Sequence, residues 1–174
     1  MRIVESAVPG AQLVILGDGP LCNPLHAMAQ SLLRNYQFIG VSDATAVRAW
    51  MEQASVVVVP SVIASDGDAE GFCMVACEAQ AMQVPVVCFT GPGLSESVAD
   101  GVTGLIVASR DEGALAEGIL TLMRNEALAR RMGVAGRRRV EQHFNLAHQT
   151  ALLEAKYDKI LGVPASASQP AEAS

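Results

Sequence analysis

The sequence predicts an α/β fold, a Rossmann-like parallel sheet with helices on both faces. Two observations predict it. Short strands that are apolar on both faces alternate with segments of helical periodicity. In addition, 51% of the residues are hydrophobic and only 17% are charged, which is typical of elements buried from two sides. Because strands buried on both faces need helices on either side, the alternation favours a doubly covered parallel sheet.

The first half of the chain predicts the order strand, helix, strand, helix, strand. The apolar run 11–17 ends in Gly-Asp-Gly-Pro, which is typical of a buried strand followed by a turn. Helical spacing indicates a helix over 24–34, whose apolar face is made of Leu25, Met28, Ala29, Leu32 and Leu33. We then expect a strand at 36–41, a helix at 44–54 capped by Asp43, and a strand at 55–60.

The second half continues this alternation after a polar loop, Ser61 to Ala69. The pattern predicts a helix at about 72–83, strands at 84–89 and 104–107, and three helices capped by Asp111, Asn125 and Asn145. The last helix has Leu146, Leu153, Tyr157 and Ile160 in register. Residues 1–162 are expected to form one domain, and the Ala/Ser/Pro-rich tail 163–174 to be disordered.

Composition also excludes several classes of protein. A net charge of −6 argues against a nucleic-acid partner, because no overall positive field attracts a polyphosphate. The apolar runs are far shorter than the ~18 residues that a membrane helix needs, and residues 1–20 lack the pattern of a signal peptide. The four cysteines form no C-x-x-C pair. We therefore expect a soluble, cytoplasmic protein with reduced thiols.

In open parallel sheets, ligands bind beyond the carboxyl ends of the strands. The loops after Leu16, Val59 and Phe89 are therefore the places where a site is expected. The first of them, Gly17-Asp18-Gly19-Pro20, has two glycines that let a ligand approach the backbone closely. The same four residues are equally typical of a plain turn.

The second loop leads into a helix that could bind an anion. Gly71 at the helix entry leaves three backbone N–H groups without intrahelical partners, those of Phe72, Cys73 and Met74. The positive end of the helix dipole adds to their attraction for a phosphate. A pyrophosphate could lie there without a metal ion.

Two carboxylates would flank this anion, because Glu70 precedes the helix and Glu78 lies on its first or second turn. Because acidic groups repel phosphate, the two carboxylates would bind other parts of the ligand. Hydroxyls at the two ends of the ligand, as in ribose and hexose, would donate hydrogen bonds to them. The structural alternative is that the dipole favours Glu70 and that Glu78 is an exposed helix residue.

The run EGFCMVACEAQAMQVPVVCFTGPGLSESVADGVTGLIV (Glu70–Val107) resembles the E-x7-E donor-site signature of family-4-type (group 1) glycosyltransferases of GT-B fold. The segments VILGDGP, FIGV and VVVVPS before it, and RRMGVAGRRRVEQHFN after it, occur in the order that this family uses. The similarity covers about residues 1–160. The narrower resemblance is to the branch that makes exopolysaccharide and lipopolysaccharide.

This resemblance implies a hexosyltransferase, commonly retaining, that uses a nucleotide diphosphate sugar and needs no cofactor or metal. Glu70 would be the catalytic residue and contact the donor hexose, and Glu78 would bind the ribose. The diphosphate would be held at Gly71 by the amides of Phe72, Cys73 and Met74. The 17–19 turn would line the cleft, and the segment from Ile39 to Val41 would lie near the base. Departing nucleoside diphosphate would be stabilised by these preorganised donors.

The sequence also departs from the family pattern. The family's donor domain opens with a further strand that carries an Arg and a Lys for the diphosphate, and both are absent here. Pro92 stands where the family usually has a glycine, which removes an amide. The resemblance further implies an N-terminal, acceptor-binding domain, which we expect to lie outside these 174 residues. We therefore expect residues 1–162 to be a donor-binding domain that does not turn over alone and that contacts a membrane at most peripherally.

Weaker motifs leave alternatives open. Asp66-Gly67-Asp68 has the D-x-D form of metal-dependent glycosyltransferases, although a surface turn explains it better. Cys73 and Cys77 are one helical turn apart, but buried small residues are favoured over a metal pair. Five arginines, at positions 130, 131, 137, 138 and 139, indicate a solvated helix face or a lipid-binding surface.

Two other functions compete with sugar transfer. The chain could be a non-catalytic nucleotide-sugar-binding module that pairs with a separate acceptor domain. It could also be half of a sugar-nucleotide epimerase of the same architecture, with the turn at Gly91–Glu96 in its site. The E-x7-E spacing and the lack of an evident general base argue against the epimerase.

Overall fold

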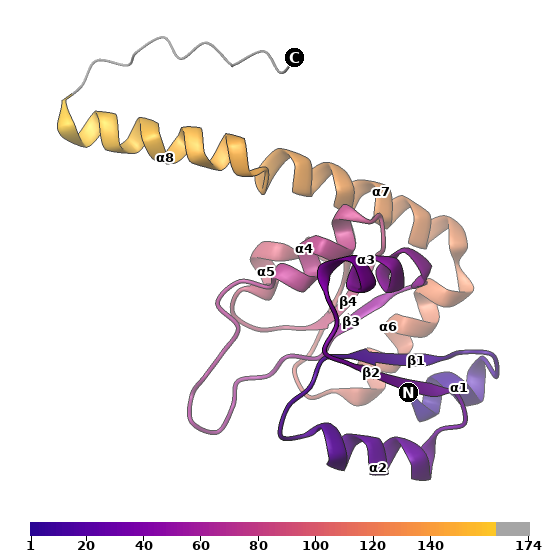
Figure 1. The fold of residues 1–174 in the computed structure, drawn as a ribbon. Helices are drawn as coiled ribbons and strands as arrows, with labels where there is room; N and C mark the ends of the chain where they lie inside the picture. The colour runs from indigo at the N-terminus through magenta and orange to yellow at the C-terminus, as the bar shows by residue number, and fades with distance from the viewer. Residues whose placement is uncertain (163–174) are drawn as a thin grey trace.

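The computed structural model describes residues 1–162 and shows strands and helices alternating along the chain (Figure 1). The predicted tail 163–174 lies outside the described residues. The elements are α1 (Arg2–Ala7), β1 (Leu13–Leu16), α2 (Cys22–Leu32), β2 (Tyr36–Gly40), α3 (Ala44–Gln53), β3 (Val57–Val59), α4 (Met74–Ala81), β4 (Val86–Phe89), α5 (Leu94–Ser97), β5 (Gly104–Val107), α6 (Glu112–Arg124), α7 (Glu126–His143) and α8 (Leu146–Leu161).

All strand pairs are parallel, which confirms the predicted class of sheet. The strands form two groups, one with the order β1-β2 and the other with the order β3-β4-β5. Within the described residues, β1 and β3 exchange no ladder hydrogen bonds, so the parallel strands form two separate hydrogen-bonded groups. Within the second group, Val87 of β4 is paired with Val58 of β3 and with Leu105 of β5.

Side-chain caps set the starts of four helices, as the sequence predicts. In each helix a side-chain oxygen accepts a hydrogen bond from an amide three residues later, at 2.8–3.1 Å. The capping residues are Asp43 for α3, Asp111 for α6, Asn125 for α7 and Asn145 for α8.

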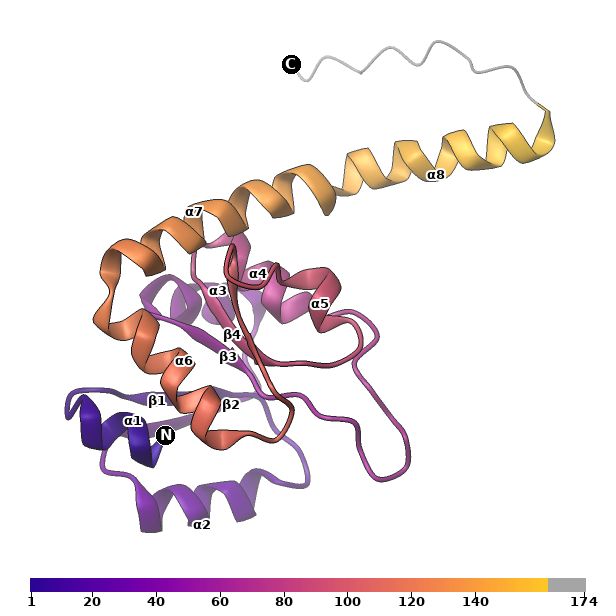
Figure 2. The same cartoon turned by 180° about the vertical axis from the view of Figure 1, so that it is seen from behind.

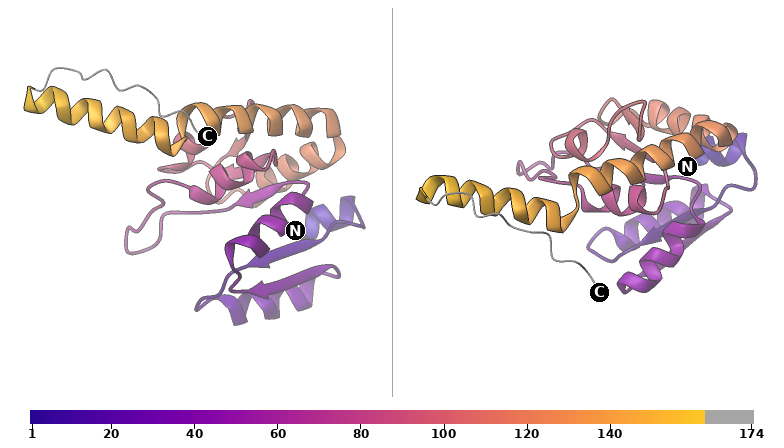
Figure 3. Two further views of the ribbon diagram at one scale, coloured as in Figure 1. Left: turned by 45° about the horizontal axis from the view of Figure 1, so that its top comes forward. Right: turned by 90° about the horizontal axis from the view of Figure 1, so that it is seen from above.

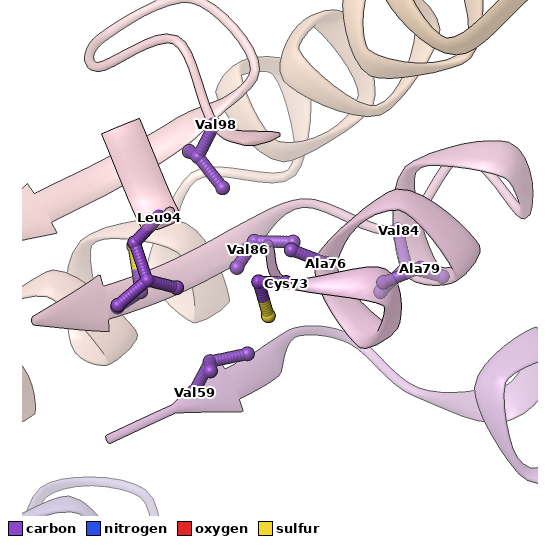
Figure 4. Packing of buried hydrophobic residues seen from close by; sticks show 9 residues of the cluster. Val59, Cys73, Ala76, Ala79, Val84, Val86, Leu94 and Val98 are labelled. Atoms are coloured by element: carbon purple, nitrogen blue, oxygen red, sulfur yellow. The ribbon is translucent and has the colours of Figure 1, made fainter. Parts of the chain in front are cut away.

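The core lies on both faces of the three-stranded group. Alternate residues of β4 face opposite sides, so Val86 and Cys88 pack under α4 while Val87 packs against α6. Figure 4 shows the first cluster, in which Val59, Cys73 and Val86 come from three different elements. On the other face, α1 lies beside α6 (Figure 2), and Val4 of α1 is fully buried there.

Helix α2 is less buried than its apolar periodicity predicts. Of the predicted apolar face of α2, Leu25, Met28 and Leu32 are exposed and only Ala29 is buried. The helix contacts β2 through His26, whose ring centroid lies 5.0 Å from that of Phe38. Helix α2 also begins two residues earlier than predicted, at Cys22.

Helix α8 continues from the end of α7 and extends away from the body of the molecule (Figure 3). The predicted register of its apolar residues holds, but no residue of α8 is buried. Leu146 is 82% exposed and Ile160 is 79% exposed. None of the helices within residues 1–162 combines the length and the apolar character that crossing a bilayer requires.

Candidate functional site

A pocket of about 250 Å³ lies beyond the carboxyl ends of β3, β4 and β5. Three loops form it, 61–70 after β3, 90–94 after β4 and 109–110 after β5, so its walls come from segments far apart in the sequence. This is the edge of a parallel sheet where ligands are expected. The volume is slightly below the ~300 Å³ lower limit of drug-sized sites, which suits one sugar ring.

Glu70 is the carboxylate of this pocket. It is half-buried, and the hydroxyl of Ser61 donates a long hydrogen bond to its Oε2, at 3.5 Å. The other pocket groups near the strand ends are hydroxyls, from Thr90 and Ser109, and the guanidinium of Arg110. Glu70 can therefore accept further hydrogen bonds from a polyhydroxylated ligand.

The helix after Glu70 begins later than predicted, at Met74, with Cys73 as its N-cap. The expectation of three unpartnered amides is therefore wrong for two of them. The N–H of Cys73 donates to Oγ of Ser97 at 3.3 Å, and the N–H of Met74 donates to the carbonyl of Phe72 at 3.1 Å. Of these three amides, only that of Phe72 has no hydrogen-bond partner among residues 1–162.

The side chain of Phe72 serves the fold rather than the pocket. Its ring meets the ring of Phe144 edge to face, with 5.2 Å between the centroids, and Arg139 lies 5.7 Å from the centre of the Phe144 ring. This packing fixes the start of α4 against the end of α7.

Gly71 and Gly93 bring two walls of the site into contact. The φ of Gly93 is +73°, and a Cβ built there would lie 2.6 Å from the carbonyl carbon of Gly71 and 2.7 Å from the carbonyl oxygen of Glu70. Only a glycine allows this approach. The loop after β4 therefore supports the backbone that carries Glu70.

Glu78 lies on the exposed face of α4, one turn after Met74, and does not line the pocket. Met74 and Val75 are also exposed on this face, Met74 at 61%. The two glutamates thus occupy different positions at one end of the sheet, Glu70 in the hollow and Glu78 outside it.

The first loop is shaped by its glycines. Gly17 has φ +118°, and its N–H donates to the carbonyl of Gly40 at 2.8 Å, which joins the ends of β1 and β2. Asp18 accepts from the N–H of Gly19 at 2.7 Å. Ile39 is half-buried and Val41 is 83% exposed. None of these residues lines the pocket, and they remain candidates by position alone.

Residues 1–139 match the family model described as "Glycosyl transferases group 1". The chain belongs to the group 1 glycosyltransferases. Over 146 residues it is 33% identical to a GDP-mannose-dependent phosphatidylinositol monomannoside mannosyltransferase of Corynebacterium glutamicum, covering 83% of this chain and 38% of that protein. It is 31% identical over 146 residues to the amylovoran biosynthesis glycosyltransferase AmsK of Erwinia amylovora, covering 83% and 36%.

Solved structures confirm the GT-B fold. Sucrose-phosphate synthase from Thermosynechococcus elongatus matches with a TM-score of 0.79 and 28% identity, over 94% of this chain and 42% of that one. HepE of Anabaena, solved with UDP-glucose, matches with a TM-score of 0.75 and 18% identity, over 91% and 44%. The chain thus spans less than half the length of these glycosyltransferases.

Four polar residues that line the pocket of this glycosyltransferase chain were not predicted from the sequence, namely Ser61, Thr90, Ser109 and Arg110. Each follows a strand end, so the rule that placed the site at these loops could have found them. Their polar side chains gave no motif by themselves. Gly91 and Pro92, which the sequence analysis noted as part of a departure from the family pattern and of the alternative epimerase site, also line the pocket.

The weaker motifs have structural roles in this family member. Asp66 accepts a hydrogen bond from the N–H of Asp68 at 3.2 Å, as in an Asx turn. Among residues 1–162 no group of three or more His, Cys, Asp or Glu side chains could hold a metal ion. Cys73 and Cys77 are buried, and burial raises the pKa of both thiols.

The five arginines of α7 divide into two groups. Arg137 pairs with Glu141 and donates to the carbonyl of Ala81, both at 2.6 Å, and Arg139 donates to the carbonyl of Glu96 at 2.7 Å. These two arginines attach α7 to the body of the domain. The other three are exposed along a shallow hollow, namely Arg130, Arg131 and Arg138.

Proposed function

We propose that residues 1–162 form the nucleotide-sugar donor-binding domain of a hexosyltransferase that acts on a polysaccharide or lipid-linked acceptor. The observation that carries this proposal is Glu70, a half-buried carboxylate in a pocket of sugar size, directly before the start of α4. Membership of the group 1 glycosyltransferases supports the transfer of a sugar as the reaction.

In this proposal the hexose occupies the pocket and its hydroxyls donate to Glu70. The diphosphate lies at the start of α4, over Gly71 and the unpartnered amide of Phe72, where the helix dipole favours negative charge. The N–H of Met74 already donates to the carbonyl of Phe72, so it contributes through the helix dipole and not as a free donor. Because the amide of Cys73 is held by Ser97, fewer donors serve the diphosphate than the motif alone indicates.

The nucleoside extends away from the pocket. Glu78 accepts hydrogen bonds from the ribose hydroxyls, and the exposed turn 17–19 and the end of β2 with Val41 lie towards the base. When the bond from the sugar to the diphosphate breaks, charge accumulates on the departing oxygen. The backbone and dipole at α4 are preorganised to stabilise that charge, so no metal or cofactor is proposed.

Acceptor binding is assigned to a domain outside residues 1–162. The matched glycosyltransferases are more than twice as long as this chain, which supports a second domain. A cleft enzyme builds its transition state from both walls and excludes water between them. We therefore expect no sugar transfer from the chain alone, and transfer once an acceptor-binding domain is supplied.

The proposal also places the enzyme in the cytoplasm, with at most peripheral contact to a membrane. Arg130, Arg131 and Arg138 are the residues that would attract anionic headgroups. Co-sedimentation with phosphatidylcholine vesicles containing 30% phosphatidylglycerol tests this contact. Binding that is lost in 0.5 M NaCl, or when all three arginines become alanine, would support it, and no binding at low salt would contradict it.

Titration calorimetry of the purified chain tests the donor site. We expect UDP or GDP to bind and Glu78→Gln to weaken that binding about ten-fold, because a charge-assisted hydrogen bond is lost. Glu70→Gln should weaken UDP-glucose or GDP-mannose but leave the free diphosphate unchanged. Glu117→Gln, an exposed residue of α6, is the matched control.

Three results would overturn parts of this assignment. If no nucleoside diphosphate binds, the donor site is wrong. If Glu78→Gln binds as tightly as the wild type, the ribose is elsewhere. Conversion of UDP-N-acetylglucosamine to its epimer by the chain would identify an epimerase instead.

A further inference from the structure

Arg110 is one of two non-glycine residues within residues 1–162 that have a positive φ. Its φ is +63°, and that of Gln83 is +60°. This left-handed region costs an ordinary side chain on the order of 1 kcal/mol. Packing explains Gln83, because its carbonyl lies directly against Gly133 of α7. Arg110 is exposed and is the third residue of a turn, which the N–H of Asp111 closes by donating to the carbonyl of Ala108 at 3.1 Å.

This turn places the guanidinium of Arg110 at the pocket. Its Nη2 donates to the carbonyl of Ile63 at 3.2 Å, across the space between the loops after β5 and β3, and both residues line the pocket. A guanidinium has five N–H donors. One is used in this contact, and the remaining donors have no partner among the described residues.

The pocket therefore holds one cation and one anion that do not neutralise each other. No ion pair joins Arg110 to any carboxylate within residues 1–162, and Glu70 is the only carboxylate among the lining residues. The other polar lining groups are neutral hydroxyls. A complementary ligand would offer hydroxyls to Glu70 and an anionic group to Arg110.

We propose that Arg110 selects a donor sugar that carries a carboxylate, a hexuronic acid, in the pocket that holds Glu70. This inference rests on the proposed donor site. A guanidinium matches a carboxylate through two parallel hydrogen bonds, which a neutral hydroxymethyl group cannot accept in the same way. The carboxylate carried by C6 of the sugar points away from the ring hydroxyls that Glu70 takes up.

The diphosphate is a less suitable partner for Arg110. The amides of the α4 start do not line the pocket, whereas Glu70 and Arg110 do. Arg110 therefore shares its surroundings with the group assigned to the sugar. The pocket volume of about 250 Å³ leaves room for one ring and not for a nucleotide as well.

Calorimetric titrations with matched ligands test this inference. The ligands are UDP, UDP-glucose and UDP-glucuronic acid, with GDP, GDP-mannose and GDP-mannuronic acid as the guanosine series. We expect the wild-type chain to bind the uronic acid about ten-fold more tightly than the neutral sugar. Arg110→Gly should abolish this preference and leave the affinity for the free diphosphate unchanged.

Arg110→Gly is also suited to the test because glycine tolerates the left-handed backbone, so the variant should fold at least as stably as the wild type. Arg110→Lys should keep part of the preference, since the charge remains but the paired donors are lost. Arg124→Ala, which removes an exposed arginine of α6, controls for net charge. Its preference should equal that of the wild type.

The outcomes separate this inference from the proposed function. Equal affinity for the neutral and acidic sugars in the wild type would overturn the role of Arg110 and leave the donor site standing. An equal loss for all three ligands of one series in Arg110→Gly would show that Arg110 serves the diphosphate, which also overturns the inference. Failure of every nucleotide to bind would overturn the donor site itself.

Discussion

The hydroxyl of Ser97 accepts a hydrogen bond from the N–H of Cys73 at 3.3 Å and donates one to the carbonyl of Gly93 at 2.9 Å. Ser97 is fully buried, and its own carbonyl accepts from the amide of Gln80 at 2.9 Å. One side chain thus joins the start of α4 to the loop after β4. These are the two walls between which Glu70 is held.

Ser97→Ala should lower the free energy of unfolding by about 1–3 kcal/mol, because the buried N–H of Cys73 and the carbonyl of Gly93 each lose a partner. Urea unfolding followed by circular dichroism measures this loss. Ser95→Ala is the matched control, since Ser95 is exposed on the same helix, α5. An equal effect of the two substitutions would show that the Ser97 contacts do not stabilise the domain.

The sequence could predict the position of the site but not its internal contacts. The parallel order and the strand ends follow from apolar runs and turns, so the loops holding Glu70 and the pocket were found. The hydrogen-bond partner of the Cys73 amide could not be predicted, because Ser97 is 24 residues away in the sequence. Ser97 also lies in a helix of only four residues, α5, which is too short to show a periodicity. The start of α4 was therefore placed two residues too early.

Periodicity also could not tell which apolar faces would be covered. The spacing in α2 and α8 is that of buried helices, yet Met28 and Leu146 are exposed in the described part of the chain. A pattern of side chains reveals which face is apolar, whereas burial depends on whether another element lies opposite. The division of the sheet between β1 and β3 has the same origin, since strand order is a long-range property.

Glu5 stabilises the turn before β2 by a contact that no local pattern reveals. Its carboxylate accepts from the N–H groups of Arg34 and Asn35, at 2.9 and 2.8 Å. Glu5→Ala should therefore lower the free energy of unfolding by about 1–3 kcal/mol. Thermal unfolding measures the change.

The control for Glu5 is Glu52→Ala. Glu52 makes only an exposed ion pair with Arg48, at 2.9 Å, so its removal should cost less than about 1 kcal/mol. A loss for Glu52→Ala as large as that for Glu5→Ala would contradict the assigned role of the α1 contact.

The buried thiol of Cys88 should make stability fall in alkali. Burial raises the pKa of Cys88 to about 11, against 9.0 for an unperturbed thiol. The folded protein thus holds this proton more tightly than the unfolded chain does. The resulting stability is complete below pH 9 and is lost between pH 9 and pH 11, at about 1.4 kcal/mol per pH unit.

Urea unfolding of the wild type and of Cys88→Ala, at pH 8 and at pH 10, measures this contribution. The variant lacks the thiol but keeps every other titrating group, and its cavity cost does not depend on pH. The wild type should therefore exceed the variant by more at pH 8 than at pH 10. A difference that stays constant between these pH values would mean that Cys88 does not titrate in the way its burial requires.

Gly93→Ala should disturb both stability and the donor site, because its Cβ would lie 2.6 Å from the backbone of Gly71. Gly101→Ala is a close control: its φ of +70° nearly equals the +73° of Gly93, but nothing lies within 4 Å of its Cβ. Conformational strain of about 1–2 kcal/mol is common to both substitutions, so any larger loss in Gly93→Ala measures the clash. Because the displaced backbone carries Glu70, calorimetry should also show weaker sugar-nucleotide binding for Gly93→Ala alone, and equal stability and affinity of the two variants would contradict the close packing of these loops.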